Sequence, residues 1–191
     1  SNRINMPETA EKVLADGDAD MVYMARPFLA DPNLVKKAIE DPAQYKVIFV
    51  HLMGSHLQYE NRFPPENMIF KDSVGVHAYT KDLSSSQLDY INAYDSSVHY
   101  TDYFLGQVIH DLKGVKGIAG MTFWSDHGEE VFDKKDFKGH GPDGVTTNML
   151  EIPFLFWRNQ AYEKAFPDIN KTLLTHTQTP IMMDDFFNIA Q

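Results

Sequence analysis

Apolar positions in residues 45–191 are grouped into three short runs and one long periodic segment. The runs "KVIFVHLMG", "IAGMTFWS" and "EIPFLFW" are rich in β-branched and aromatic residues and predict three buried strands. Pro153 indicates an edge position or an irregular start for the third strand. Between the first two runs, apolar residues recur on one face from about residue 84 to 112, which predicts a long helix capped by Ser84–Ser86 and ended by Gly114 or Gly117.

The remaining segments of this region are expected to connect these elements. Residues 61–82 and 132–147 have no sustained period and predict loops, and Thr179–Pro180 is typical of a helix start. The order strand, helix, strand, loop, strand predicts an α/β fold with a mostly parallel sheet and flanking helices.

Residues 1–44 differ in character from the rest. Pro7 suits the first turn of a helix that Gly17 ends, residues 19–25 predict a short strand, and Asp31–Pro32 opens a second helix to about Ile39. The chain is therefore predicted to consist of a short α/β appendage, residues 1–44, and a larger α/β region, residues 45–191.

Composition excludes several classes of function. Lys and Arg number 17 against 27 Asp and Glu, a formal charge of −10, so a nucleic-acid partner is not expected. The absence of cysteine rules out disulfides and thiolate zinc sites in this chain. No apolar run approaches the ~20 residues of a membrane-spanning helix, so the sequence as given is expected to be soluble.

Ionisable residues follow the predicted strands directly. Asp126 and His127 follow the second predicted strand, and His51 follows the first. In parallel α/β sheets functional groups collect at the carboxyl ends of strands, and carboxylate and imidazole are standard zinc ligands. The pair therefore indicates a metal site, with a capped turn, in which Asp126 accepts backbone N–H bonds, as the alternative.

Glycine-flanked histidines support a site for an anion. His51 and His56 bracket "HLMGSH", and His140 lies in "KGHGPDG". An imidazole can hold a phosphoryl oxygen as charge develops on it, although for each histidine taken alone a structural role is the favoured interpretation. Glu129 and Glu130 are predicted either to orient the ligands or to form a solvated helix start. Four other histidines lack such a setting: His77, His99, His110 and His176.

Several ordered motifs resemble one enzyme family. "HLMGSHLQYENRFP", "INAYDSSVHYTDYFLGQVI", "SDHGEEV", "FKGHG" and "EIPFLFW" resemble the phosphoethanolamine transferases, whose periplasmic domain has the alkaline phosphatase/sulfatase fold. The resemblance covers residues 45–160. It implies zinc ligands at Asp126 and His127 and phosphate-holding residues at His56 and His140. His51, from the same segment as His56, is predicted to be a supporting residue.

The same resemblance implies an activity and a location. Such enzymes act at the periplasmic face of the bacterial inner membrane and move phosphoethanolamine from phosphatidylethanolamine to lipopolysaccharide, on lipid A or the core. Their threonine nucleophile and an acidic zinc ligand precede the HxMGxH segment, and no matching threonine is found here. Four threonines of this region match no nucleophile motif: Thr101, Thr122, Thr146 and Thr147. A partial zinc site with little turnover is therefore expected, and a non-catalytic scaffold is the alternative.

The amino-terminal segment resembles a different family. "RINMPETAEKVLADGDADMVYMARPFLADP" is similar to the last βα unit of 2,4-dienoyl-CoA reductases of the old yellow enzyme class, in which Arg26 would lie near the flavin phosphate. One βα unit of eight cannot close a barrel, so FMN binding and enoyl reductase activity are not expected.

The sulfatase-like sheet predicted in residues 45–191 lacks its amino-terminal half. Such an incomplete sheet should leave an exposed edge, which predicts self-association.

Overall fold

The computed structural model describes residues 12, 16, 48–71, 78–80 and 82–182. The predicted appendage of residues 1–44, including Arg26, lies outside the described residues apart from Lys12 and Asp16. The boundary at residue 44 stays a prediction.

A long helix, α4 (Ser85–Lys113), forms as the periodicity predicts, and its start is explained by its capping residues. The Ser84 hydroxyl accepts the Gln87 backbone N–H while the Gln87 side chain accepts the Ser84 backbone N–H, so two otherwise unpaired donors are satisfied. Gly114 follows as the carboxyl cap. The buried positions lie in the amino-terminal half, from Ile91 to Ser97.

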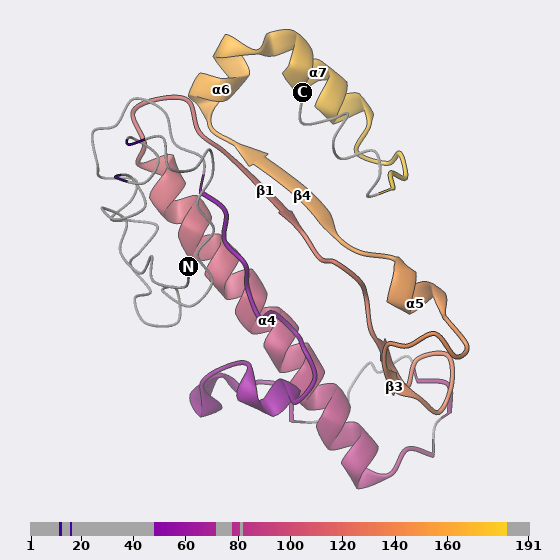
Figure 1. The fold of residues 1–191 in the computed structure, drawn as a ribbon. Coiled ribbons are helices and arrows are strands. Elements are labelled where there is room, and N and C mark those ends of the chain that lie inside the picture. Colours follow the sequence, from indigo (N-terminus) through magenta and orange to yellow (C-terminus); the bar gives the residue numbers. More distant parts are fainter. Residues whose placement is uncertain (1–11, 13–15, 17–47, 72–77, 81, 183–191) are drawn as a thin grey trace.

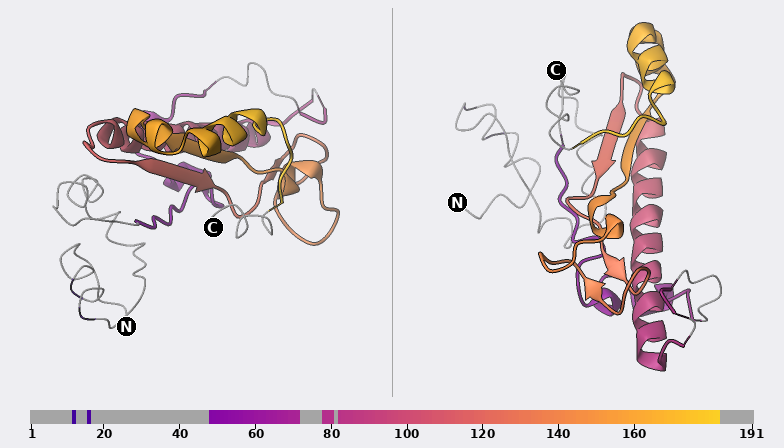
Figure 2. Two further views of the ribbon diagram at one scale, coloured as in Figure 1. Left: turned by 90° about the horizontal axis from the view of Figure 1, so that it is seen from above. Right: turned by 90° about the vertical axis from the view of Figure 1, so that its right-hand side faces the viewer.

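The strands β1 (Gly120–Trp124) and β4 (Phe154–Arg158) lie side by side, and α4 runs alongside them (Figure 1, Figure 2). They pair antiparallel, with Gly120 opposite Arg158 and Trp124 opposite Phe154. The predicted parallel sheet is therefore wrong for the described residues. The chain between the two strands contains only a small hairpin and the single-turn helix α5 (Thr147–Leu150), so no crossover helix returns it to the starting end.

The first predicted strand is also absent from the described part of its run. From Ile48 to Gly54 only Val50 makes a strand-like bridge, and Ile48 and Phe49 are 40% exposed. No partner strand for this run occurs within residues 48–71 or 82–182. The run is apolar enough for a strand, but a strand also needs a hydrogen-bonding neighbour. Self-association through such open edges stays a prediction.

Short elements occur where loops were expected. β2 (Glu130–Val131) and β3 (Lys138–Gly139) form an antiparallel hairpin; β3 lies within residues 132–147, which were expected to be a loop, and β2 lies directly before them. The 3-10 helices η1 (Tyr59–Asn61) and η2 (Pro65–Asn67) precede α4. After β4 come α6 (Gln160–Ala165) and α7 (Pro167–Thr175), and residues 179–182 are not helical, so the described part of the expected helix start at Thr179 is wrong.

A small core joins α4, η1 and the β2–β3 hairpin. Ile91, Val131 and Phe132 are buried together. Tyr59 is 0% exposed, and its ring lies 4.9 Å from that of Tyr90 and 5.0 Å from that of Tyr94, centroid to centroid. This core fixes the start of α4 against the hairpin that carries the site. None of the described helices has the length and hydropathy needed to cross a membrane.

A pair of acidic residues beside this core predicts a pH-dependent stability. Burial, and after it the charge of Asp133, raise the pKa of Asp95 on α4. The folded chain then keeps this proton to a higher pH than the unfolded chain, so this group's contribution to the free energy of unfolding falls as pH rises through the raised pKa. We expect Asp95→Asn to raise the free energy of unfolding at pH 7 by about 0.5–1 kcal/mol.

Urea denaturation of both proteins between pH 4 and 7 measures this effect. The difference between Asp95→Asn and the parent chain should shrink toward pH 4, where the Asp95 carboxyl binds its proton. Asp102→Asn, on the exposed side of α4, is the matched control and should change stability by less than about 0.5 kcal/mol. A gain from Asp95→Asn that is equal at every pH would contradict the explanation.

Candidate metal centre

The site begins where β1 ends. The Ser125 hydroxyl donates to the His127 carbonyl at 2.7 Å, and the His127 backbone N–H donates to Asp126 Oδ1 at 3.1 Å. These local bonds turn the chain out of the strand. Gly128 then donates its N–H to the Met149 carbonyl of α5 at 2.9 Å. The turn therefore has a fixed position relative to the helix that follows the hairpin.

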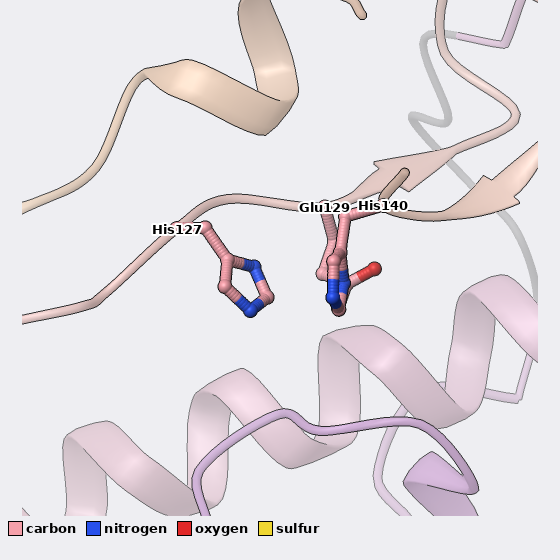
Figure 3. A group of neighbouring side chains, drawn as sticks. All are labelled: His127, Glu129 and His140. Atoms are coloured by element: carbon pink, nitrogen blue, oxygen red, sulfur yellow. The ribbon is translucent and has the colours of Figure 1, made fainter. Parts of the chain in front are cut away.

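Three side chains converge just beyond this turn, as Figure 3 shows. One possible ligand atom from each of His127, Glu129 and His140 lies within 4.8 Å of the other two. His140 Nδ1 is 2.9 Å from Glu129 Oε1, and the two imidazole rings have centroids 3.8 Å apart. His127 and Glu129 come from the chain entering β2, and His140 directly follows β3, so the hairpin brings them together.

Glu129 is the buried member of this group. It is 8% exposed, and its Oε2 atom is buried with no hydrogen bond of normal geometry to a described residue, although the Tyr59 hydroxyl is close enough to interact with the carboxylate. A buried carboxylate oxygen needs a donor or a cation. Two imidazoles and a carboxylate are also the ligand types that zinc takes in proteins. The residues present therefore fit a zinc ion on their donor chemistry and on this buried oxygen.

The charge of Glu129 acts on three neighbouring tyrosines. Burial, followed by the charge of Glu129, raises the pKa of Tyr94 to about 12. Burial first, with Glu129 among the further causes, also raises the pKa of Tyr59 and of Tyr90. These phenols stay neutral at physiological pH, so the three tyrosines are uncharged neighbours of the Glu129 carboxylate.

Asp126 lies apart from the group. Its side chain is 84% exposed, and its Oδ2 is 3.8 Å from His127 Nε2. The local bond to the His127 N–H matches the capped-turn interpretation, whereas the ligand role of Asp126 implied by the family resemblance stays a prediction. His127 is in the group, as a ligand must be, but its assignment to zinc is likewise still predicted.

The other predicted phosphate-holding residue is not in the group. His56 and His51 are both exposed on the segment before η1. The His56 carbonyl accepts a hydrogen bond from Arg62 Nε at 3.0 Å, which folds this segment on itself. The structure thus brings His140 next to His127 and leaves His56 outside the cluster; the phosphate-holding roles of His56 and His140 stay predictions.

Glu130 points away from the group and is fully buried. Its Oε1 accepts the Lys134 backbone N–H and its Oε2 accepts the Thr146 hydroxyl, each at 2.7 Å. Because Glu129 and Glu130 are both buried and Glu130 begins a strand, the interpretation of this doublet as a solvated helix start is wrong.

No nucleophile is identified among the threonines considered. The Thr101 hydroxyl donates to the Ser97 carbonyl at 3.1 Å and the Thr146 hydroxyl to Glu130, so both have other partners. Thr122 lies within β1 and Thr147 begins α5.

Two features of the site were missed from the sequence. Glu129 was assigned only a supporting role, although it stands two residues after His127, and in extended chain such residues share a face. That spacing was the available signal. Tyr59 was not singled out, and nothing in its local sequence distinguishes a buried tyrosine from an exposed one.

Comparison with known proteins places these features in a family. A family model described as Sulfatase matches residues 12–188. The chain is 34% identical over 142 residues to phosphoethanolamine transferase EptC of Escherichia coli K12, which is 72% of this chain and 24% of that protein. It is 37% identical over 134 residues to phosphoethanolamine transferase CptA of Salmonella typhimurium, 69% of this chain and 23% of that protein.

Solved structures agree with this placement. The C-terminal periplasmic domain of EptC from Escherichia coli aligns with a TM-score of 0.66 and 29% identity over 77% of this chain and 41% of that domain. The same domain in complex with Zn aligns with a TM-score of 0.66 and 28% identity over 80% of this chain and 43% of that domain. The chain thus spans about a quarter of the length of the full-length relatives and less than half of the solved domains.

Proposed function

Because the chain belongs to the sulfatase family, we propose that it contributes the zinc and phosphate side of a phosphoethanolamine transferase active site. The observation that carries this proposal is the convergence of His127, Glu129 and His140 beyond the end of β1. The proposed donor is phosphatidylethanolamine and the proposed acceptor is lipopolysaccharide, at the periplasmic face of the inner membrane. Similar proteins include two named Kdo(2)-lipid A phosphoethanolamine 7''-transferases, which supports lipid A as the acceptor class.

In this proposal zinc would be held by His127 together with Asp126 or Glu129. Two protein ligands would leave the site open, because catalytic zinc takes three protein ligands and keeps a position for substrate. When bound, zinc acts as a Lewis acid that favours deprotonation of a hydroxyl nucleophile and offsets charge on phosphate oxygens. No threonine of this sequence matches the nucleophile motif of the family, so the isolated chain is expected to release little or no diacylglycerol from phosphatidylethanolamine.

The two histidines have separate tasks in this proposal. With Glu129 ionised, the 2.9 Å contact makes His140 Nδ1 the donor to Glu129 Oε1. His140 Nε2 is then left to face a substrate oxygen. In the imidazolium form its N–H donates a hydrogen bond to a phosphoryl oxygen. His56 is proposed to bind the same phosphate from the η1 side once substrate is present.

Zinc titration of the purified chain tests the proposal. We expect the parent chain to bind one zinc weakly, and His127→Ala to weaken binding by more than about 100-fold, beyond the effect of losing an outer partner. Isothermal titration calorimetry gives both the stoichiometry and the dissociation constant. Asp126→Ala and Glu129→Gln, measured in parallel, show which carboxylate binds the ion.

His110→Ala is the matched control, since His110 is exposed on α4 at a distance in sequence from the site. It should leave the dissociation constant unchanged. Absence of zinc binding by the parent chain, or an equal loss in His110→Ala, would overturn the proposed zinc site. A scaffold role would instead predict that Asp126→Ala, Glu129→Gln and His127→Ala alter only stability.

A further inference from the structure

We propose that Glu130 is a positioning residue that holds the loop of residues 132–146 in place and thereby keeps His140 against Glu129. The inference rests on the proposed function, because the importance of His140 comes from it. Adjacent residues of an extended strand point to opposite faces. Glu129 faces the site, and Glu130 faces the interior of the loop that returns to it.

One carboxylate contacts both ends of this loop. Glu130 is 0% exposed, and its two oxygens accept the Lys134 backbone N–H and the Thr146 hydroxyl, each at 2.7 Å. Lys134 lies before His140 in the sequence and Thr146 lies after it. The bond pair therefore closes the loop at its base, with His140 between the two contacts.

The hairpin transmits this closure to His140. Glu130 is directly opposite Gly139 in the β2–β3 pairing, and His140 is the next residue. The turn between the strands is tight: Phe132 has a φ of 62°, and its N–H donates to the Phe137 carbonyl at 3.1 Å. A shift of the loop base would accordingly move the residue that carries the imidazole.

The contact between Glu130 and Thr146 links the loop to α5. Thr146 is the residue that caps the start of α5, yet its hydroxyl makes no bond to that helix and donates to Glu130 instead. α5 in turn accepts the Gly128 N–H through the Met149 carbonyl. Glu130 thus joins the hairpin to the helix that also fixes the His127 turn, so both histidines are set by one framework.

The chemistry of Glu130 is unusual for a purely packing position. Burying a carboxylate is costly unless hydrogen bonds compensate it, and an apolar side chain would fill the same volume without that cost. A carboxylate has two acceptor oxygens at fixed geometry, so it can bond two segments at once. The two bonds of Glu130, to the Lys134 N–H and to the Thr146 hydroxyl, therefore form a clamp at the base of the loop.

Thr146→Val and Thr146→Ser test the clamp in the full 191-residue chain. Valine keeps the shape of threonine and removes its hydroxyl donor, whereas serine keeps the donor. The first measurement is the nuclear Overhauser contact between the His127 and His140 rings, whose centroids are 3.8 Å apart. We expect Thr146→Val to weaken this contact and Thr146→Ser to keep it, with the amide shifts of α4 unchanged in both variants.

The second measurement is the zinc dissociation constant. Thr146→Val should weaken zinc binding by about 10-fold, the low end for residues that orient ligands, and Thr146→Ser by far less. Glu130→Gln, which keeps the side-chain shape, is a second variant expected to weaken the ring contact in the same direction. Unchanged amide shifts of α4 show that a variant is folded. If either Thr146→Val or Glu130→Gln fails this check, the other variant is used for the comparison.

The outcomes separate the clamp from the proposed function. A ring contact and a zinc affinity that are both unaffected in Thr146→Val and Glu130→Gln would overturn the clamp, while zinc binding by the parent chain would still support the transferase site. If the parent chain binds no zinc, but the ring contact is lost only in Thr146→Val and Glu130→Gln, the proposed function fails and the clamp stands.

Discussion

Gly128→Ala is expected to destabilise the chain by about 3 kcal/mol or more and to abolish zinc binding, through a backbone clash. A Cβ atom at Gly128 would lie 2.0 Å from the Asn148 carbonyl oxygen and 3.0 Å from that of Glu151. Both obstacles are backbone atoms of α5 and its end, so no side-chain rotation can relieve the overlap. Either α5 moves or the turn carrying His127 does.

Chemical denaturation and zinc titration of Gly128→Ala measure the two consequences together. Loss of the Gly128 N–H bond to Met149, at 2.9 Å in the structure, should accompany the shift. Because His127 precedes and Glu129 follows Gly128, displacement of this residue separates the group that zinc would bind. We expect a lower denaturation midpoint and no measurable zinc affinity.

Gly106→Ala is the matched control for this substitution. Gly106 lies within α4, and a Cβ there meets no atom within 4 Å. Alanine has a higher helix propensity than glycine, so this variant should be more stable than the parent by up to about 1 kcal/mol. Equal stability of Gly128→Ala and Gly106→Ala would show that the α5 backbone does not restrain the turn as the structure indicates.

The longer elements and the place of the site follow from local sequence. α4 could be predicted because its apolar positions recur over many turns and because Ser84 and Gln87 form a capping box. β1 and β4 could be predicted because each is rich in aromatic and other apolar residues. His127 was assigned to a site because it follows a strand, and the structure places it there with His140.

The pairing and the burial of charge do not follow from local sequence. Whether β1 and β4 run parallel depends on the path of the residues between them, and two-residue strands such as β2 are too short to show a period. Glu129 and Glu130 were open to a solvated interpretation because composition does not reveal which carboxylates the fold encloses. Only the hairpin partners of Glu130, Lys134 and Thr146, explain how it is buried.

Tyr59→Ala is expected to lower the free energy of unfolding by about 3–5 kcal/mol, the range for deleting a large buried side chain. Tyr59 is 0% exposed and its ring packs against Tyr90 and Tyr94 of α4. Its removal would leave a cavity between η1 and the start of α4. Because the charge of Glu129 is among the causes that raise the pKa of Tyr59, after burial, the cavity also lies next to the site carboxylate.

Tyr59→Phe separates the ring from its hydroxyl. That hydroxyl is buried with no hydrogen bond of normal geometry to a described residue, and it interacts only loosely with the Tyr90 hydroxyl and the Glu129 carboxylate, so deleting it should change stability by less than about 1 kcal/mol. Urea denaturation of the two variants should therefore show a large loss of unfolding free energy for Tyr59→Ala and almost none for Tyr59→Phe. A loss in Tyr59→Phe as large as that in Tyr59→Ala would show that the hydroxyl, through Glu129, stabilises the site more than the aromatic packing does.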